Sequence, residues 1–196
     1  RGYTLNNNGS CAGAVVNEYF TQHFPNAVET SRAFRNHTSG TNHTYRWMTQ
    51  SWLVSMYRHC NESVLNRFGG PTSDLECPTA AELAAFEETV KAGDITWHAF
   101  PHNSEPEMYE EGLFLASLNL TFREDAYYGH PPRRTLSQRD VPGLTRAAIP
   151  LLNKYGVTAV SVGENGACAP LNVPLIFRWR DNATESEVLA MFHPRG

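Results

Sequence analysis

An aspartate stands between a strand-like segment and a helix-like segment in the second half of the chain. Residues 134–138 form a short alternating run, which predicts the end of a β-strand, and Asp140 follows almost at once. Pro142 and Gly143 then signal a turn, and residues 144–154 have apolar side chains at helical spacing. Proteins of the α/β class keep catalytic groups at the carboxyl ends of strands, so Asp140 is a candidate catalytic carboxylate. The alternative is that Asp140 only caps the following helix or closes an Asx turn.

Strand-like and helix-like segments alternate four or five times along the 196 residues. This alternation predicts an α/β fold with parallel strands, either an open doubly wound sheet or a parallel βα barrel or part of one. The length and the 41% of hydrophobic residues suit a single domain over residues 1–196 with a buried core. We expect strands at residues 45–50, 94–99, 134–138, 157–162 and 175–180, and helices at residues 12–35 (interrupted at Pro25), 52–58, 79–92, 108–122 and 144–154.

Both architectures bring the carboxyl ends of the strands to one edge of the sheet. Gln50, the segment 98–105, Asp140 and Glu164 stand at or just after the ends of predicted strands. Because α/β proteins bind ligands at this edge, we expect these groups to converge there. Glu164 has an alternative interpretation, since it could equally be an ordinary acidic residue of the exit turn.

The segment after the second predicted strand is polar and contains two prolines that stiffen it. A stiff polar loop presents ligand groups well, so its side chains are expected to contact a substrate. The alternatives are a buried core histidine at position 98, with an ordinary hydrogen-bond partner, and a solvated loop for the rest. The residues predicted to contact the substrate are His98, His102, Asn103 and Glu105.

Composition excludes several classes of function. The net charge is −4 and no run of Lys or Arg is present, so a nucleic-acid partner is not expected. No apolar stretch approaches the roughly 20 residues that cross a bilayer, so no membrane span is expected. The chain starts at Arg1 without a signal-peptide pattern, which predicts a processed or trimmed product. Gly-rich phosphate loops, Gly-x-Ser-x-Gly elbows and Cys/His nucleophile signatures are absent from the sequence.

Cysteines and glycosylation motifs predict a secreted glycoprotein. The 4 cysteines are even in number and lack the C-x-x-C spacing of metal sites, which favours disulfides. Cys60 with Cys77 and Cys11 with Cys168 is the expected pairing, although four cysteines allow three connectivities. Asn-x-Ser/Thr sequons are frequent for a chain of this length and point to a secretory compartment. The predicted glycosylation sites are Asn8, Asn36, Asn42, Asn61, Asn119 and Asn182.

Three motifs appear in a fixed order along the chain. They are Lys-Ala-Gly-Asp-Ile-Thr-Trp-His-Ala at residues 91–99, Ser-Gln-Arg-Asp-Val-Pro-Gly-Leu-Thr at 137–145 and Leu-Ile-Phe-Arg-Trp-Arg at 175–180. The last two resemble the family 38 glycoside hydrolases, the retaining α-mannosidases. All three are similar to an uncharacterised group of proteins related to that family. The resemblance covers about residues 2–180.

The resemblance implies a seven-stranded parallel βα barrel, or part of one, with a zinc ion and a carbohydrate substrate. In this family the aspartate of the Asp-x-x-Gly turn is both a metal ligand and the nucleophile that forms the glycosyl-enzyme intermediate. Asp140 is the matching position, so the resemblance gives Asp140 both roles. A carboxylate that attacks the anomeric carbon while a second acid protonates the leaving oxygen is the chemistry of retaining glycosidases.

The chain also departs from the family pattern. The family has a His-x-Asp metal pair just before a Gly-aromatic-Thr step, but here residues 2–4 of that step follow directly on Arg1. The last metal histidine and the acid/base carboxylate of the family come from later segments. Most zinc ligands would therefore lie outside this chain, and zinc sites use three or four ligands. We expect a fragment or a processed piece whose partners are other chains or segments of the same precursor.

A second hypothesis comes from another class of protein. The chain would be a catalytically inactive extracellular glycoprotein subunit, glycan-binding or structural, that retains the hydrolase-like fold. A third hypothesis, a barrel like that of polysaccharide deacetylases, which also use Asp and His metal ligands, ranks lower.

Overall fold

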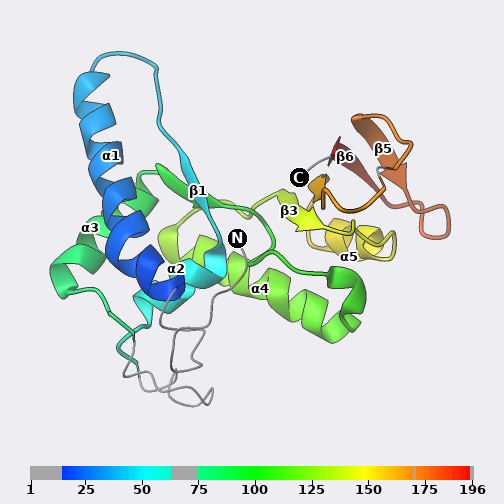
Figure 1. Cartoon of the computed structure of the whole chain (residues 1–196), viewed down its shortest axis with the longest axis horizontal. Helices are drawn as coiled ribbons and strands as arrows, with labels where there is room; N and C mark the ends of the chain where they lie inside the picture. Colours follow the sequence, from blue (N-terminus) through cyan, green and yellow to red (C-terminus); the bar gives the residue numbers. More distant parts are fainter. Residues whose placement is uncertain (1–14, 63–74, 170, 195–196) are drawn as a thin grey trace. The chain divides into compact units, whose positions relative to one another are not determined.

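The computed structural model describes residues 15–62, 75–169 and 171–194 (Figure 1). Contacts between backbone segments divide the chain into two compact units. The first unit contains the residues up to Thr49 together with Leu53–Thr96, and the second contains Gln50–Trp52 and the residues from Trp97 onward. The single domain expected over residues 1–196 stays a prediction.

The first unit begins with two consecutive helical segments. The π-helix η2 spans Tyr19–His23, and the α-helix α1 follows at Phe24–His37. Pro25 is among the first residues of α1, and the backbone stays helical from η2 into α1, since His23 and Phe24 both have right-handed helical φ and ψ. A split of the helix at Pro25 is therefore not formed; only the helix type changes, from π to α, at Phe24, and a kink there stays a prediction.

Short strands and further helices follow. Strand β1 (Trp47–Thr49) pairs with β2 (Ile95–Trp97), and helix α2 spans Ser51–Arg58. Helix α3 (Ala80–Lys91) packs beside α1 (Figure 1). The capping box is present, since the Glu82 N–H donates to Thr79 Oγ1 and the Thr79 N–H donates to the Glu82 carboxylate. The sequence predicts a helix over residues 79–92, and this reciprocal pair defines where α3 begins.

Aromatic side chains form the core of the first unit. The ring of Phe24 lies 4.9 Å from Tyr57 and 4.7 Å from Phe86, measured between ring centroids. The ring centroids of Tyr57 and Phe86 are also 4.9 Å apart. The three ring pairs have edge-to-face or tilted orientations, which suit the quadrupoles of the rings. Burial raises the pKa of Tyr57 to about 12. This cluster joins α1, α2 and α3 into one unit.

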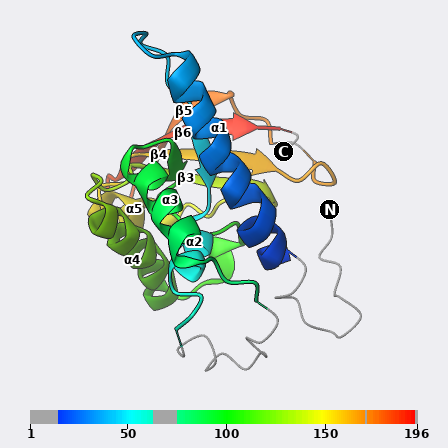
Figure 2. The ribbon, with the colours of Figure 1, turned by 90° about the vertical axis from the view of Figure 1, so that its left-hand side faces the viewer.

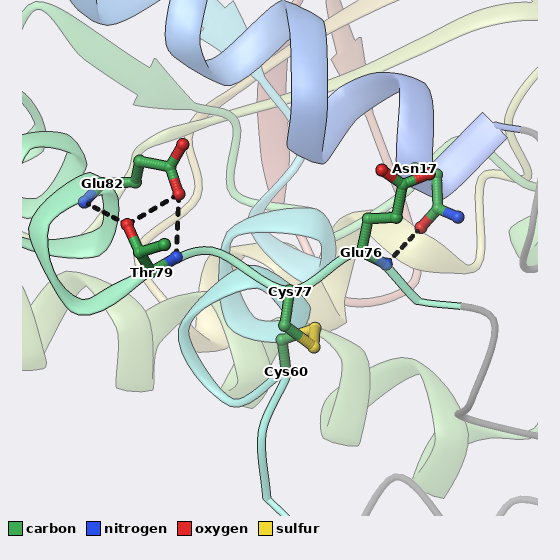
Figure 3. The surroundings of a disulfide bond; sticks show 6 residues. All are labelled: Asn17, Cys60, Glu76, Cys77, Thr79 and Glu82. Carbon is green, nitrogen blue, oxygen red and sulfur yellow. Dashed lines mark hydrogen bonds between the residues drawn. A yellow bond between two sulfur atoms is a disulfide. The ribbon is translucent and has the colours of Figure 1, made fainter.

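A disulfide between Cys60 and Cys77 cross-links two segments of the first unit (Figure 3). It links the turn after α2 to the segment before α3, with the two Cα atoms 5.5 Å apart. Beside it the Glu76 N–H donates to the Asn17 side-chain oxygen at 2.9 Å. The Cys60–Cys77 pairing is therefore confirmed. Cys11 lies outside the described residues, so its pairing with Cys168 stays a prediction.

Removal of this disulfide is expected to destabilise the protein. The bridge spans 17 residues of chain, and closing a loop of that length restricts the unfolded state by about 3 kcal/mol. We expect the double variant Cys60→Ala/Cys77→Ala to lose that free energy of unfolding in urea denaturation. An unchanged unfolding midpoint would contradict the expectation. Any reductant sensitivity that the double variant still shows would report a second disulfide, Cys11–Cys168.

The second unit contains a four-stranded sheet and two α-helices. Its helical segments are η5 (Pro106–Met108), α4 (Glu111–Tyr128) and α5 (Ala148–Lys154), and its strands are β3 (Thr135–Val141), β4 (Ala159–Glu164), β5 (Ile176–Arg180) and β6 (Glu187–His193). The strand order is β3-β4-β6-β5. Strands β3, β4 and β6 are parallel, and β5 runs antiparallel to β6 at the edge (Figure 2).

The two faces of this sheet differ in character. On one face Leu136, Val160 and Ala190 belong to a buried apolar cluster with Ile149 and Leu152 of α5. The other face, which we call the open face, alternates with it along each strand, and its side chains are partly or fully exposed; Gly163 on this face has no side chain and is buried. The open face consists of Ser137, Arg139, Ser161, Gly163, Leu189, Met191 and His193.

The α/β class and the parallel strands are confirmed, but the barrel is not. The described strands form one two-stranded and one four-stranded sheet, and within this part of the chain no sheet closes into a barrel. Strand β6 is not among the elements that the sequence predicts, since the last predicted strand covers residues 175–180. Helix α4 continues past the predicted end at residue 122 to Tyr128, where Gly129 adopts a left-handed φ of 73°. Within the described ranges, no helix is long and apolar enough to cross a membrane.

Candidate functional site

Asp140 lies in an irregular turn of the backbone at the carboxyl end of β3. The pairing of β3 with β4 shifts between Arg139 and Val141, which leaves Asp140 as the extra residue of a bulge. Its φ is +57°, a left-handed value that aspartate tolerates better than most residues but that still costs about 1–3 kcal/mol. Bulges and left-handed residues of this kind are frequent beside functional sites.

The carboxylate of Asp140 is exposed and oriented by one neighbour. Asn165, just after β4, donates from Nδ2 to Asp140 Oδ1 at 2.7 Å. The Asn165 side-chain oxygen accepts from the Ala167 N–H at 2.8 Å, so its amide nitrogen is the group left to face the carboxylate. Among the described residues, nothing donates a hydrogen bond to the second oxygen of Asp140, which is therefore available to a ligand.

Asp140 does not cap the following helix. Helix α5 begins only at Ala148, and its N-cap residue is Ala147 without a side-chain cap. Within the described part of the chain, the Asp140 carboxylate accepts only from the Asn165 side chain, so an Asx turn is not formed either. The structural alternatives considered for Asp140 are therefore wrong, and its carboxylate is committed to no local backbone group.

The segment 98–105 is fastened to β3 by two amide side chains. Gln138 is fully buried, accepts from the Ser104 N–H at 2.8 Å and donates to the His102 carbonyl at 3.1 Å. Asn103 donates to the Arg139 carbonyl and accepts from the Arg139 N–H at 2.7 Å. This loop therefore lies along β3, directly beside the residues that precede Asp140. Both polar groups of Asn103 already bind the backbone, which makes it a positioning residue; its predicted contact with substrate stays a prediction.

The two histidines of this segment are half-buried. Burial lowers the pKa of His98, and the charges of Arg139 and Arg133 lower it further. Burial likewise lowers the pKa of His102, whose Nε2 lies 2.7 Å from the Tyr109 hydroxyl. Because an ordinary histidine has a pKa near 6.5, both rings are uncharged at neutral pH. Their predicted substrate contacts, like that of the exposed Glu105, stay predictions.

Glu164 is buried at the carboxyl end of the neighbouring strand, β4. It is the last residue of β4, pairs in register with Val141 and is 3% exposed. Its Oε2 is buried without a hydrogen-bond partner among the described residues. A carboxylate oxygen in this situation is costly to bury. The sequence placed Glu164 at this edge, and its burial distinguishes it from an ordinary turn acid.

The described residues alone do not make a zinc site. Within these ranges, no group of three or more His, Cys, Asp or Glu side chains is placed to hold a metal ion. Zinc sites in proteins need three or four such ligands. The donors around Asp140 are an asparagine amide and backbone groups, which do not fit zinc. Zinc bound by Asp140 thus stays a prediction that requires ligands from outside the described residues.

The predicted glycosylation sites are accessible wherever the structure describes them. Asn36, Asn42, Asn61, Asn119 and Asn182 are all exposed. Asn8 lies outside the described residues. Exposure is necessary for a glycan in the folded protein but does not show that one is attached, so these sites stay predictions.

Comparison with solved structures shows which fold this is. An α-mannosidase from Enterococcus faecalis V583 matches 88% of this chain with a TM-score of 0.55 and 9% sequence identity. A 4-α-glucanotransferase from Thermococcus litoralis matches 91% of this chain with a TM-score of 0.54 and 10% identity. The fold is glycoside-hydrolase-like. At these identities the likeness concerns the fold alone, and the chain spans only 18% and 25% of those two proteins.

Sequence comparisons do not extend this result. No protein-family model matches the chain, and no curated protein matches it. Membership in family 38 of the glycoside hydrolases therefore stays a prediction.

Sequence reasoning missed the residues that orient the site. Gln138, Arg139 and Asn165 contact the segment 98–105 or Asp140, but none was predicted as a functional residue. A signal for Arg139 was present, because alternation along β3 places Ser137 and Arg139 on the face opposite the apolar Leu136. Asn165 had no comparable signal, since its contact with Asp140 spans 25 residues and depends on the register of β3 and β4.

Proposed function

We propose that this chain is part of a secreted retaining glycoside hydrolase in which Asp140 is the nucleophile. The observation that supports the proposal is the Asp140 carboxylate itself: exposed, held through one oxygen by Asn165, and located at a strand end of a glycoside-hydrolase-like fold. Ligand sites of parallel α/β folds lie at the carboxyl ends of their strands. The disulfide and the exposed sequons agree with secretion.

The proposed reaction proceeds in two displacements. The free oxygen of Asp140 attacks the anomeric carbon as the glycosidic bond breaks, while a second acid donates a proton to the leaving oxygen. Water then attacks the glycosyl ester, the same acid acts as base, and the Asp140 carboxylate is released. Asn165 keeps one carboxylate oxygen occupied and so directs the other toward the sugar. We assign the second acid to no residue of this chain, since the resemblance to family 38 puts it in later segments.

Covalent trapping tests this proposal. The natural, full-length protein would be incubated with fluorinated mannosyl and glucosyl fluorides, which retaining enzymes convert into slowly hydrolysed glycosyl esters. After digestion, mass spectrometry should locate one sugar on the peptide that contains Asp140. A label on another carboxylate would remove Asp140 from the nucleophile role. The matched control is the Asp140→Asn variant, which should remain unlabelled.

The second candidate function is an inactive extracellular subunit. The observation in its favour is that the described residues gather no metal-binding group around Asp140. This candidate predicts no labelling and no turnover of aryl glycosides by the full-length protein, together with retained binding to a glycan array. Turnover that depends on Asp140 would exclude it.

A further inference from the structure

A positively charged side chain without a carboxylate partner stands on the open face, one residue before Asp140. Arg139 is exposed, and among the described residues its guanidinium takes part in no ion pair. Its Nη2 donates to the hydroxyl oxygen of Ser161 at 3.4 Å. An arginine has five N–H donors, so most of its hydrogen-bonding capacity is unused here.

Ser161 links Arg139 to a second polar side chain. Its Oγ lies 3.3 Å from Nε2 of His193, the last residue of β6. Arginine, serine and histidine thus come from three adjacent parallel strands in the order β3, β4, β6. Each reaches the same side of the sheet, because all three belong to the open face.

The strand register places these side chains close together on the open face. Arg139 pairs with Gly163, and Gly163 pairs with His193, so the three residues form one row across the sheet. Neighbouring strands are about 4.8 Å apart, which places the backbones of Arg139 and His193 about 10 Å from each other. The buried Gly163 between them contributes no side chain to this row, and Ser161 lies two residues before it on the same face.

The side chains of Arg139, Ser161 and His193 can together offer donors to a negatively charged group. A guanidinium binds phosphate, sulfate or carboxylate oxygens through parallel N–H donors, and such charge-assisted hydrogen bonds are stronger than neutral ones. The positive charge of Arg139 also acts on its surroundings, since it contributes to lowering the pKa of His98. The nearest negative charge along the chain is Asp140, whose carboxylate is held by Asn165 instead of Arg139.

We propose that Arg139, Ser161 and His193 form an anion-recognition site that selects sugars with a negatively charged substituent. That the ligand is a sugar rests on the proposed function. That the ligand is negatively charged rests on the arrangement of Arg139, Ser161 and His193. Because Arg139 and Asp140 are consecutive, a sugar whose anomeric carbon lies at Asp140 places a charged substituent of the same or the adjoining residue against Arg139. The enzyme would therefore prefer phosphorylated, sulfated or uronic sugars to neutral ones.

Direct binding tests the anionic component without activity. Calorimetric titrations of the full-length protein in 0.15 M NaCl (about physiological ionic strength) would use inorganic phosphate, sulfate, a hexose 6-phosphate, a hexuronate and the uncharged hexose. We expect the charged sugars to bind more tightly than the uncharged hexose, and their order to identify the preferred anion. Equal affinity for charged and uncharged sugars would overturn the inference.

Variants locate the site. Arg139→Gln is expected to weaken binding of the preferred anion about 10- to 100-fold, as loss of a charge-assisted hydrogen bond implies. The backbone of Arg139 keeps its hydrogen bonds with Asn103, so the variant should fold. Ser161→Ala should weaken binding about 3- to 10-fold. The matched control is Arg134→Gln, an exposed arginine just before β3, which should leave binding unchanged. Equal losses for Arg139→Gln and Arg134→Gln would show only general electrostatic attraction and would overturn the site.

The two proposals can fail separately. If the protein binds anions through Arg139 but shows no glycoside turnover and no covalent labelling, the anion site is supported and the hydrolase function is contradicted. If Asp140 is labelled but anion binding does not depend on Arg139, the hydrolase function is supported and the anion site is contradicted. Backbone and imidazole NMR signals of His193 should shift on anion addition in the first case and stay unchanged in the second.

Discussion

Replacing Asp140 with alanine is expected to reduce turnover of a glycoside substrate by about 10³-fold or more, because a covalent nucleophile has no substitute. Fluorescent or nitrophenyl glycosides that the full-length protein hydrolyses would supply the assay. Asn165→Ala should lower turnover by a smaller factor, about 10-fold, since it removes only the hydrogen bond that orients the carboxylate. A near-normal rate in Asp140→Ala would remove this residue from the mechanism.

Chemical rescue distinguishes a lost nucleophile from a damaged fold. Alanine at position 140 leaves space beside the anomeric carbon, so added azide should restore turnover of an activated glycoside and give a glycosyl azide of inverted configuration. A misfolded variant would show no rescue. Glu187→Gln is the matched control: Glu187 is a partly exposed acid at the start of β6, at the other end of the sheet from Asp140, and its substitution should change turnover by less than about twofold.

The second large effect is expected on stability, at Asp125 in helix α4. Its side chain is 1% exposed and accepts from the Trp97 indole N–H at 2.8 Å and from Arg133 Nε at 3.0 Å. The Arg133 backbone N–H donates to the other carboxylate oxygen at 3.0 Å, and the guanidinium lies 5.0 Å from the centre of the Trp97 ring. Burial raises the pKa of Asp125, while Arg133 and the hydrogen bonds from Arg133 and Trp97 act in the opposite direction. All of these groups are donors, so the arrangement suits an ionised carboxylate.

Asp125→Ala is expected to lower the free energy of unfolding by about 3–5 kcal/mol, because it leaves the partly buried Arg133 and the Trp97 N–H without their partner. Urea denaturation of the full-length protein would measure the loss. The double variant Asp125→Ala/Arg133→Met should recover part of it, since no charge is then left unpaired. The exposed pair Arg32–Glu88 supplies the control, and Glu88→Ala should cost less than about 1 kcal/mol. A loss for Asp125→Ala as small as that for Glu88→Ala would contradict the expectation.

Several elements were predictable because their causes are local. The start of α3 depends on Thr79 and Glu82, which are three residues apart and form a capping box. Alternation of strand-like and helix-like segments predicted the α/β class and the parallel strands β3 and β4. Asp140 was found for the same reason, since a strand, an acid and a turn follow one another within a few residues.

Elements without a local signal were missed. Strand β6 was absent from the predictions, although apolar side chains alternate along it at Val188, Ala190 and Phe192. Its partners β4 and β5 decide that it forms a strand, and β5 became an antiparallel edge strand because it pairs only with β6. Neither the end of a sheet nor its closure into a barrel can be read from the spacing of apolar residues.

The sequence by itself determined the α/β class and the position of Asp140 at a strand end, and it favoured the Cys60–Cys77 disulfide among three possible connectivities. Tertiary structure alone decided what surrounds that carboxylate: Asn165 beside it, Gln138 under the segment 98–105, and Arg139 in a row with His193. The physical reason is strand register. A slip of one residue between β3 and β4 would turn every side chain of the slipped strand to the opposite face, so these contacts exist only once the buried apolar face has fixed the pairing.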